Sequence, residues 1–158
     1  MLIGRDVMNF DWGDHRKVRW RRLCSELLGG EEYVDSMTAL LNLDSRHSTA
    51  EEVIPSEHLE SGLQQYVWPL LQELPPRIVC PLTNRVWTTV APLIAPLQIP
   101  FAACPIPLSR PPIIFRLPAT TFTTILIKPH NHPSRPFMSN DQMADLGKAC
   151  RWFLGDSA

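Results

Sequence analysis

Apolar positions along the chain follow two patterns that predict different elements. Short continuous apolar runs predict buried strands, whereas apolar residues recurring every three to four positions predict amphipathic helices. The runs predict four strands, over residues 1–4, 36–43, 77–82 and 123–129. The helical stripes lie at residues 17–30, 56–74, 84–91 and 139–154. Strands and helices are therefore expected to alternate along the chain.

Capping residues mark several of the predicted helix ends. Gly29 follows the last apolar turn of the first helix, as a C-terminal cap would. Thr83 can cap the third helix, and Ser139 with Gln142 three residues later has the pattern of a capping box. Pro69 lies inside the second helical stretch, so we expect a kink or a division there.

The alternation predicts one α/β domain over residues 1–158, a three-layer α/β/α sandwich around a central four-stranded parallel sheet. Proline contributes 16 of the 158 residues. Residues 95–118 are expected to form a proline-rich connection with a short extended piece at 99–104. A strand that starts at Met1 is short for such a fold, so we expect either a minimal version of the fold or a missing N-terminal segment.

Composition narrows the class of protein. Apolar residues make up 44% and charged residues 20% of the chain, the proportions of a soluble globular protein. The sequence has neither an apolar segment of the roughly 18 residues that span a membrane nor a signal-peptide pattern. We therefore expect a cytoplasmic monomer without a membrane partner. Because the formal net charge is −1, affinity for nucleic acid would have to come from a local patch.

Cysteine and histidine spacing gives little support to a metal site. His130 and His132 form an HxH pair, but Pro129 and Pro133 bracket it and no third ligand is near in sequence. The cysteines are scattered without a CxxC pair and are interpreted as small buried apolar residues. They are Cys24, Cys80, Cys104 and Cys150. We predict no metal.

Polar motifs follow three of the four predicted strands. The motif GRD (residues 4–6) follows the first apolar run, LLN (40–42) ends the second, and HPS (132–134) follows the fourth. In parallel α/β sheets, ligands bind outside the carboxyl ends of the strands. We therefore expect the three motifs to meet at one edge of the sheet.

In this order, the three motifs resemble those of the uracil-DNA glycosylase superfamily, and the compact bacterial members in particular. That family carries glycine, a variable residue and an acid or asparagine after its first strand, then an apolar run ending in asparagine, then a late His-Pro-Ser loop. The first motif departs from the family because Val7 and Met8 stand where a proline is usual. The resemblance implies a DNA glycosylase of base excision repair that removes uracil or a related damaged base without a cofactor.

The resemblance also implies roles for three residues. Breaking the bond between base and deoxyribose develops positive charge on the sugar and negative charge on the base, so an anion and a hydrogen-bond donor are needed. Asp6 would position the water and stabilise the sugar, and His132 would donate a hydrogen bond to the base. Asn42 would read the base edge, because an amide both donates and accepts.

Further residues are implied as contacts to DNA, whose target base must leave the duplex. Met8 stands where the classical branch has an aromatic that blocks the thymine methyl, and Phe10 or Trp12 could stack on the base. The expected contacts to DNA after the histidine are Ser134 and Arg135, and Phe137 and Met138 occupy the stretch that holds the wedge in the family. A candidate phosphate-binding face comprises Arg16, Lys17 and Arg19, with Arg21 and Arg22 beyond them.

Other interpretations stay open from the residues alone. Asp6 and Asn42 each fit an ordinary turn at a strand end, and the basic run fits the solvated face of a helix. An inactive glycosylase-like module that binds nucleic acid or protein is the main alternative. A hydrolase of free nucleosides is another, and it would need neither a wedge nor a phosphate-binding helix.

Overall fold

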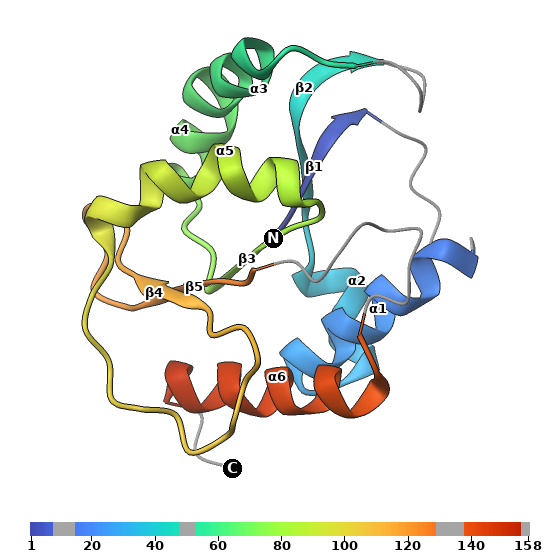
Figure 1. Ribbon diagram of the computed structural model, residues 1–158, viewed down its shortest axis with the longest axis vertical. Helices are drawn as coiled ribbons and strands as arrows, with labels where there is room; N and C mark the ends of the chain where they lie inside the picture. The colour runs from blue at the N-terminus through green and yellow to red at the C-terminus, as the bar shows by residue number, and fades with distance from the viewer. Residues whose placement is uncertain (8–14, 48–52, 129–137, 156–158) are drawn as a thin grey trace.

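The computed structural model describes residues 1–7, 15–47, 53–128 and 138–155. Five strands within these ranges form one sheet in the order β2-β1-β3-β5-β4 (Figure 1). β1 pairs in parallel with β2 and β3, β3 pairs in parallel with β5, and β4 runs antiparallel to β5. The strands are β1 (Leu2–Val7), β2 (Leu40–His47), β3 (Ile78–Pro81), β4 (Ile113–Phe115) and β5 (Thr124–Leu126).

The predicted fold class, with its four-stranded parallel sheet, is wrong because the sheet is mixed and has an antiparallel edge strand, β4. This strand lies within the stretch expected to be a proline-rich connection. Its three residues are too few to show a pattern, and the prolines before it are tolerated at the start of an edge strand. The backbone N–H of Ile99 donates to the Ile114 carbonyl at 3.0 Å, but residues 99–104 form no strand.

The second strand begins and ends later than the sequence predicts. Residues Val34–Met37 form the short helix α2 after a 3₁₀ turn, η1, at Glu31–Tyr33. β2 then continues through four polar residues, because its backbone pairs with β1 as far as the match of Val7 with His47. The apolar run predicts that this strand ends at Leu43, but polar side chains do not prevent backbone pairing. Asn42 therefore lies inside a strand rather than at its end.

The helices begin and end close to where their caps predict. The Thr83 side chain accepts a hydrogen bond from the Val86 N–H, and both bonds of the Ser139–Gln142 capping box are present. Gly29 ends the first helix with a positive φ of 82°. These three predictions are confirmed. The helices are α1 (His15–Leu28), α3 (Ser56–Gly62), α4 (Trp68–Glu73), α5 (Asn84–Ile94), the 3₁₀ turn η3 (Ala95–Leu97) and α6 (Asn140–Leu154).

Between α3 and α4 the chain forms a π-helical segment, η2 (Leu63–Val67), instead of a break. The Trp68 N–H donates to the Leu63 carbonyl, five residues back. Pro69 has no N–H and would clash with the carbonyl four residues before it in a regular α-helix. A wider turn just ahead of the proline relieves that clash, so the helix continues past Pro69.

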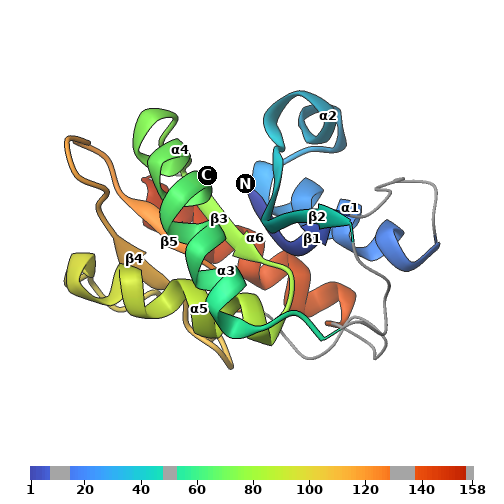
Figure 2. The same cartoon turned by 90° about the horizontal axis from the view of Figure 1, so that it is seen from above.

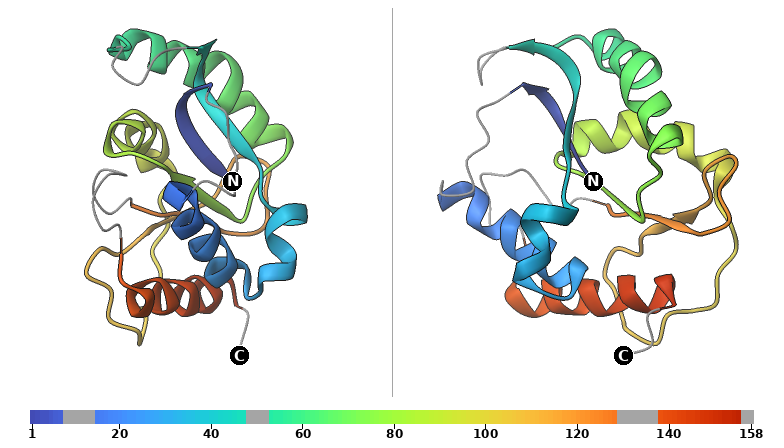
Figure 3. Two further views of the ribbon diagram at one scale, coloured as in Figure 1. Left: turned by 90° about the vertical axis from the view of Figure 1, so that its right-hand side faces the viewer. Right: turned by 180° about the vertical axis from the view of Figure 1, so that it is seen from behind.

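Two hydrophobic clusters cover the two faces of the sheet. One gathers residues of α1 and α6, including Trp20, Leu23 and Met143, and the other gathers residues of α3, η2, α4 and α5. Figure 1 shows α6 and α5 on opposite sides of the strands, and Figure 3 shows the same separation from the side. Figure 2 shows α3 and α5 next to each other, and they belong to the cluster on the same face of the sheet. In the described part of the chain, no helix has the length and apolarity to cross a membrane.

Close backbone contacts fix two of the helices. A Cβ on Gly62 would lie 1.5 Å from the Leu43 carbonyl oxygen, so the end of α3 meets β2 at a point where only glycine fits. A Cβ on Gly147 of α6 would lie 2.3 Å from the Glu26 carbonyl oxygen of α1. The same carbonyl accepts a hydrogen bond from the Arg151 guanidinium. These contacts hold α1 and α6 side by side beneath the sheet.

Three of the four cysteines, Cys24, Cys80 and Cys150, are buried in the α1–α6 cluster, as predicted, whereas Cys104 is partly exposed. Burial raises the pKa of Cys150 from 9.0 to about 12, and it also raises the pKa of Cys80. Above about pH 9 the unfolded chain therefore loses thiol protons that the folded chain keeps. Stability should fall as the pH rises through this window.

We expect the free energy of unfolding to be lower at about pH 10.5 than at about pH 8, by on the order of 1 kcal/mol for each buried thiol. Urea denaturation at the two pH values measures the difference. Cys150→Ala should show a smaller fall, because the variant has one thiol fewer to titrate. An identical fall in both proteins would mean that Cys150 does not contribute.

Candidate functional site

The pairing of β1 with β2 places two of the sequence motifs side by side. Gly4 of the GRD motif is the Cα partner of Asn42, and Asp6 is the partner of Asp44. The register shifts between Asp6 and Val7, where β2 carries extra residues before the match of Val7 with His47. Such irregularities are common next to functional sites. The first two motifs are therefore neighbours in the sheet, although many residues separate them in sequence.

The chain enters the segment that carries the third motif from the same edge of the sheet. The Ile127 N–H donates to the Val79 carbonyl at 2.9 Å, which continues the pairing of β5 with β3. By the registers of β1, β3 and β5, Lys128 stands level with Ile3, one residue short of Gly4. β5 lies two strands from β1, about 10 Å across the sheet. Lys128, the last described residue before segment 129–137, therefore lies at nearly the same level of the sheet as the first two motifs.

Side-chain contacts fix both ends of the segment 129–137. At the first end, the Lys128 ammonium lies 5.7 Å from the ring centroid of Trp87 on α5, a cation–π contact. At the second end, Met138 is buried in the α1–α6 cluster, and its carbonyl accepts a hydrogen bond from the Arg19 guanidinium. The Arg19 bond links α1 to the residue just before α6.

Most of the predicted site residues lie outside the described residues. His132 is one of these residues, so its role stays a prediction. For Asp6 and Asn42 the structure describes the backbone, which lies in β1 and β2, respectively. Arg16 and Lys17 likewise lie on α1. The other predicted contacts outside the described ranges are Met8, Phe10, Trp12, Ser134, Arg135 and Phe137.

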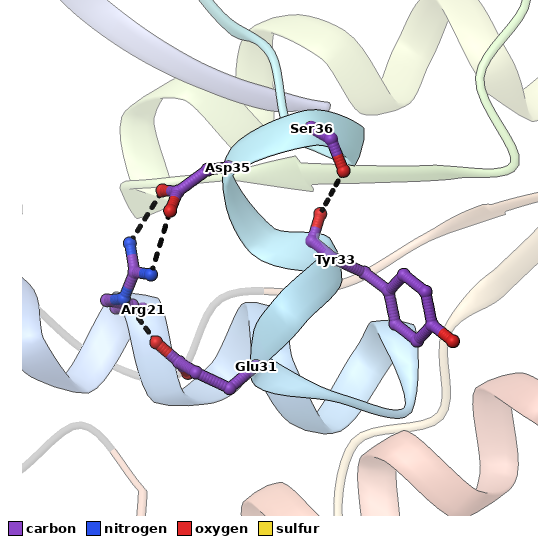
Figure 4. Close-up of polar contacts among 5 residues, drawn as sticks. All are labelled: Arg21, Glu31, Tyr33, Asp35 and Ser36. Atoms are coloured by element: carbon purple, nitrogen blue, oxygen red, sulfur yellow. Dashed lines mark hydrogen bonds and ion pairs between the residues drawn. The ribbon is translucent and has the colours of Figure 1, made fainter.

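Part of the basic run on α1 is already paired within the protein. The Arg21 guanidinium donates to both carboxylate oxygens of Asp35, at 2.8 and 3.1 Å, and its Nε–H donates to Glu31 (Figure 4). The hydrogen bonds from Arg21 hold the pKa of the Asp35 carboxyl below its ordinary value. Arg22 has an ion pair with Glu26 at 3.9 Å. Arg21 therefore holds α1 against η1 and α2, which is a structural role.

A small pocket of about 50 Å³, open to solvent, lies beside Lys128 and Met138, the described residues on either side of segment 129–137. Sequence reasoning did not find it, because its walls come from three distant stretches: the connection at 107–112, the end of β5 and the first half of α6. The lining combines apolar side chains with an arginine, an amide and a carboxylate. Its lining includes Leu108, Arg110, Ile127, Lys128, Met138, Gln142 and Asp145.

Among the described residues, no three histidine, cysteine, aspartate or glutamate side chains come together as metal ligands would. His130 and His132 lie outside those ranges. The predicted site residues Asp6, Asn42 and His132 offer a carboxylate, an amide and an imidazole. These groups suit acid–base and hydrogen-bond catalysis.

No protein-family model matches the chain, and no curated protein matches it. A functional assignment therefore depends on the three motifs in the sequence and on the backbone placement of the first two in the sheet.

Proposed function

We propose that the protein is a DNA N-glycosylase, which hydrolyses the bond between deoxyribose and uracil or a related damaged base. The observation that carries the proposal is the backbone register that pairs Gly4 with Asn42 and brings Lys128 to nearly the same level. The first two motifs, far apart in sequence, thereby lie side by side on parallel strands, and the stretch that leads to the third ends at nearly the same level of the sheet. This adjacency supports the proposal beyond the motif letters.

In the proposed mechanism, a carboxylate and a donor act on opposite sides of the bond that breaks. Asp6 holds the attacking water and stabilises the positive charge that develops on the sugar. His132 donates a hydrogen bond to the base oxygen, where negative charge accumulates as the base leaves. Water is the only co-reactant that the reaction needs. Its hydroxyl oxygen bonds to the sugar carbon as the bond to the base breaks, and its proton goes to the departing base.

Asn42 selects the base in this mechanism. Its amide can accept one hydrogen bond and donate two, which matches the mixed donor and acceptor edge of uracil. A site built on such paired bonds rejects a base with the wrong edge, because buried polar groups would be left unpaired. Stacking of the extruded base on Phe10 or Trp12 would stabilise the flipped state.

The proposal predicts that base release requires a DNA strand. We expect free uracil from an oligonucleotide that contains one deoxyuridine, and at least about 100-fold slower release from free deoxyuridine, because remote contacts to the strand position the reacting bond. Mass spectrometry of the released base measures both rates. Equal rates on the two substrates would favour the hydrolase of free nucleosides and contradict the proposed function.

A further inference from the structure

The connection between η3 and β4, residues 98–112, runs alongside α6. Near the start of the connection, the Phe101 ring meets the Phe153 ring edge to face, with 4.8 Å between the ring centroids. Nearer its end, Leu108 lines the small pocket together with Leu146, an earlier residue of α6. Figures 1 and 3 show the connection passing the C-terminal half of α6. The connection and the helix therefore pass each other in opposite directions.

Two cysteines lie between these contacts, one on each element. Cys104 follows Phe101 by three residues, and Cys150 precedes Phe153 by three residues. On α6, Leu146, Cys150 and Phe153 stand four and three residues apart, the spacing that places side chains on one face of a helix. The antiparallel course of the connection therefore brings Cys104 to the level of Cys150.

The connection also packs on the hydrophobic cluster that contains Cys150. Ile99 and Leu108, which lie on either side of Cys104 in the chain, pack against this cluster. The pKa of Cys150 agrees with this placement: burial raises it, the charge of Arg151 lowers it and the Cys104 thiol raises it, to about 12. Cys104 is thus close enough to Cys150 to affect its ionisation.

The two thiols differ in their access to solvent. Cys104 is partly exposed, whereas Cys150 is completely buried. Cys24 and Cys80 are buried as well. A dissolved oxidant therefore meets Cys104 first, and Cys150 can be oxidised only through Cys104.

We propose that Cys104 and Cys150 form a reversible disulfide when the protein meets a small-molecule disulfide such as oxidised glutathione. The bond would fasten the connection to α6 and fix the two walls of the pocket relative to each other. It requires Cα atoms no more than about 7 Å apart, so its formation also tests the side-by-side placement. The inference is independent of the glycosylase proposal.

The reaction has two thiol–disulfide exchange steps. The Cys104 thiolate attacks one glutathione sulfur, which breaks the glutathione disulfide and releases one glutathione thiolate. The Cys150 thiolate then attacks the Cys104 sulfur and releases the second glutathione thiolate. Two protein thiols are oxidised and one glutathione disulfide is reduced, and the two thiol protons pass through solvent to the released thiolates.

Peptide mass spectrometry of the folded protein after exposure to oxidised glutathione tests this assignment. Wild type should contain the Cys104–Cys150 disulfide and no glutathione, and dithiothreitol should restore both thiols. Cys150→Ala should keep one glutathione on Cys104, because the attacking thiol is absent. Cys24→Ala is the matched control, since it removes a buried thiol of the same cluster, and it should form the same disulfide as wild type. Wild type that keeps glutathione on Cys104, or that links Cys104 to another cysteine, would overturn the proposal.

The rate of the second step is an independent readout. Because the pKa of Cys150 is about 12, its thiolate fraction rises about 10-fold for each unit of pH below that value. Loss of glutathione from wild type should therefore become roughly 100-fold faster between about pH 7 and about pH 9. A rate that does not change with pH would exclude Cys150 as the attacking thiol.

Cys104→Ser decides the question if Cys150→Ala does not fold, because it changes only the partly exposed cysteine. A disulfide restricts the unfolded chain, so oxidation should raise the midpoint of urea denaturation in wild type. The midpoint of Cys104→Ser should stay the same with or without oxidised glutathione. An equal rise in both proteins would contradict the proposed disulfide.

Discussion

Gly62→Ala should destabilise the protein by about 3 kcal/mol or more, which is the upper part of the range for overpacked cores. The added Cβ would lie 1.5 Å from the Leu43 carbonyl oxygen, a backbone atom that cannot turn aside. Gly62 has an ordinary helical φ of −61°, so backbone strain at the glycine is not the reason. To make room, the end of α3 must move away from β2. The midpoint of urea denaturation measures the loss.

Ser61→Ala is the control for this substitution, since Ser61 is exposed and precedes Gly62 in α3. Alanine is at least as good a helix former as serine, so we expect a change within about 0.5 kcal/mol. A Gly62→Ala protein as stable as Ser61→Ala would show that the end of α3 does not approach β2 closely. Because β2 carries Asn42, the same contact supports one wall of the candidate site.

Asp6→Asn and His132→Ala should each reduce the rate of uracil release by about 100-fold, the size expected for losing a general base or a donor to the developing anion. Asparagine keeps the shape of Asp6 but cannot carry the negative charge that stabilises the sugar. Alanine removes the imidazole donor. Single-turnover kinetics at saturating DNA isolate the chemical step from binding.

The binding constants of the same two variants provide the control. Both should bind uracil-containing DNA within a few-fold of wild type, because an interaction made only in the transition state does not affect the ground state. Variants with wild-type rates would remove Asp6 and His132 from the mechanism. A loss of binding in step with the rate would instead indicate misfolding, which the urea midpoint detects.

The sequence predicts the helices better than the strands, for a physical reason. Helix ends are encoded locally, as in the capping box at Ser139 and the cap at Thr83, and the structure confirms both. Strand ends depend on a partner that is distant in sequence. β2 extends to His47 because β1 lies beside it, and β4 exists because β5 offers an edge. No local pattern in polar residues 44–47 or in the three residues of β4 carries that information.

In the candidate site, too, local features can be recognised in the sequence, whereas contacts between distant residues cannot. The motif letters could be found in the sequence, whereas the register that pairs Gly4 with Asn42 could not. The bond from Arg19 to the Met138 carbonyl joins residues 119 positions apart. From the sequence, an arginine in a basic run fits a phosphate contact, because solvent exposure is the default for a charged side chain. Only the packing of α1 beside α6 turns it inward.

The most direct test of the glycosylase proposal is to measure free uracil, abasic product and DNA binding in the same samples, with wild-type protein and oligonucleotides that carry one uracil. Single- and double-stranded substrates should both be used, with urea denaturation to verify folding. The proposal predicts equal amounts of free uracil and abasic sites, growing with time. Binding to the uracil-containing strand without release of base, by well-folded protein at high concentration, would contradict it and favour a binding module.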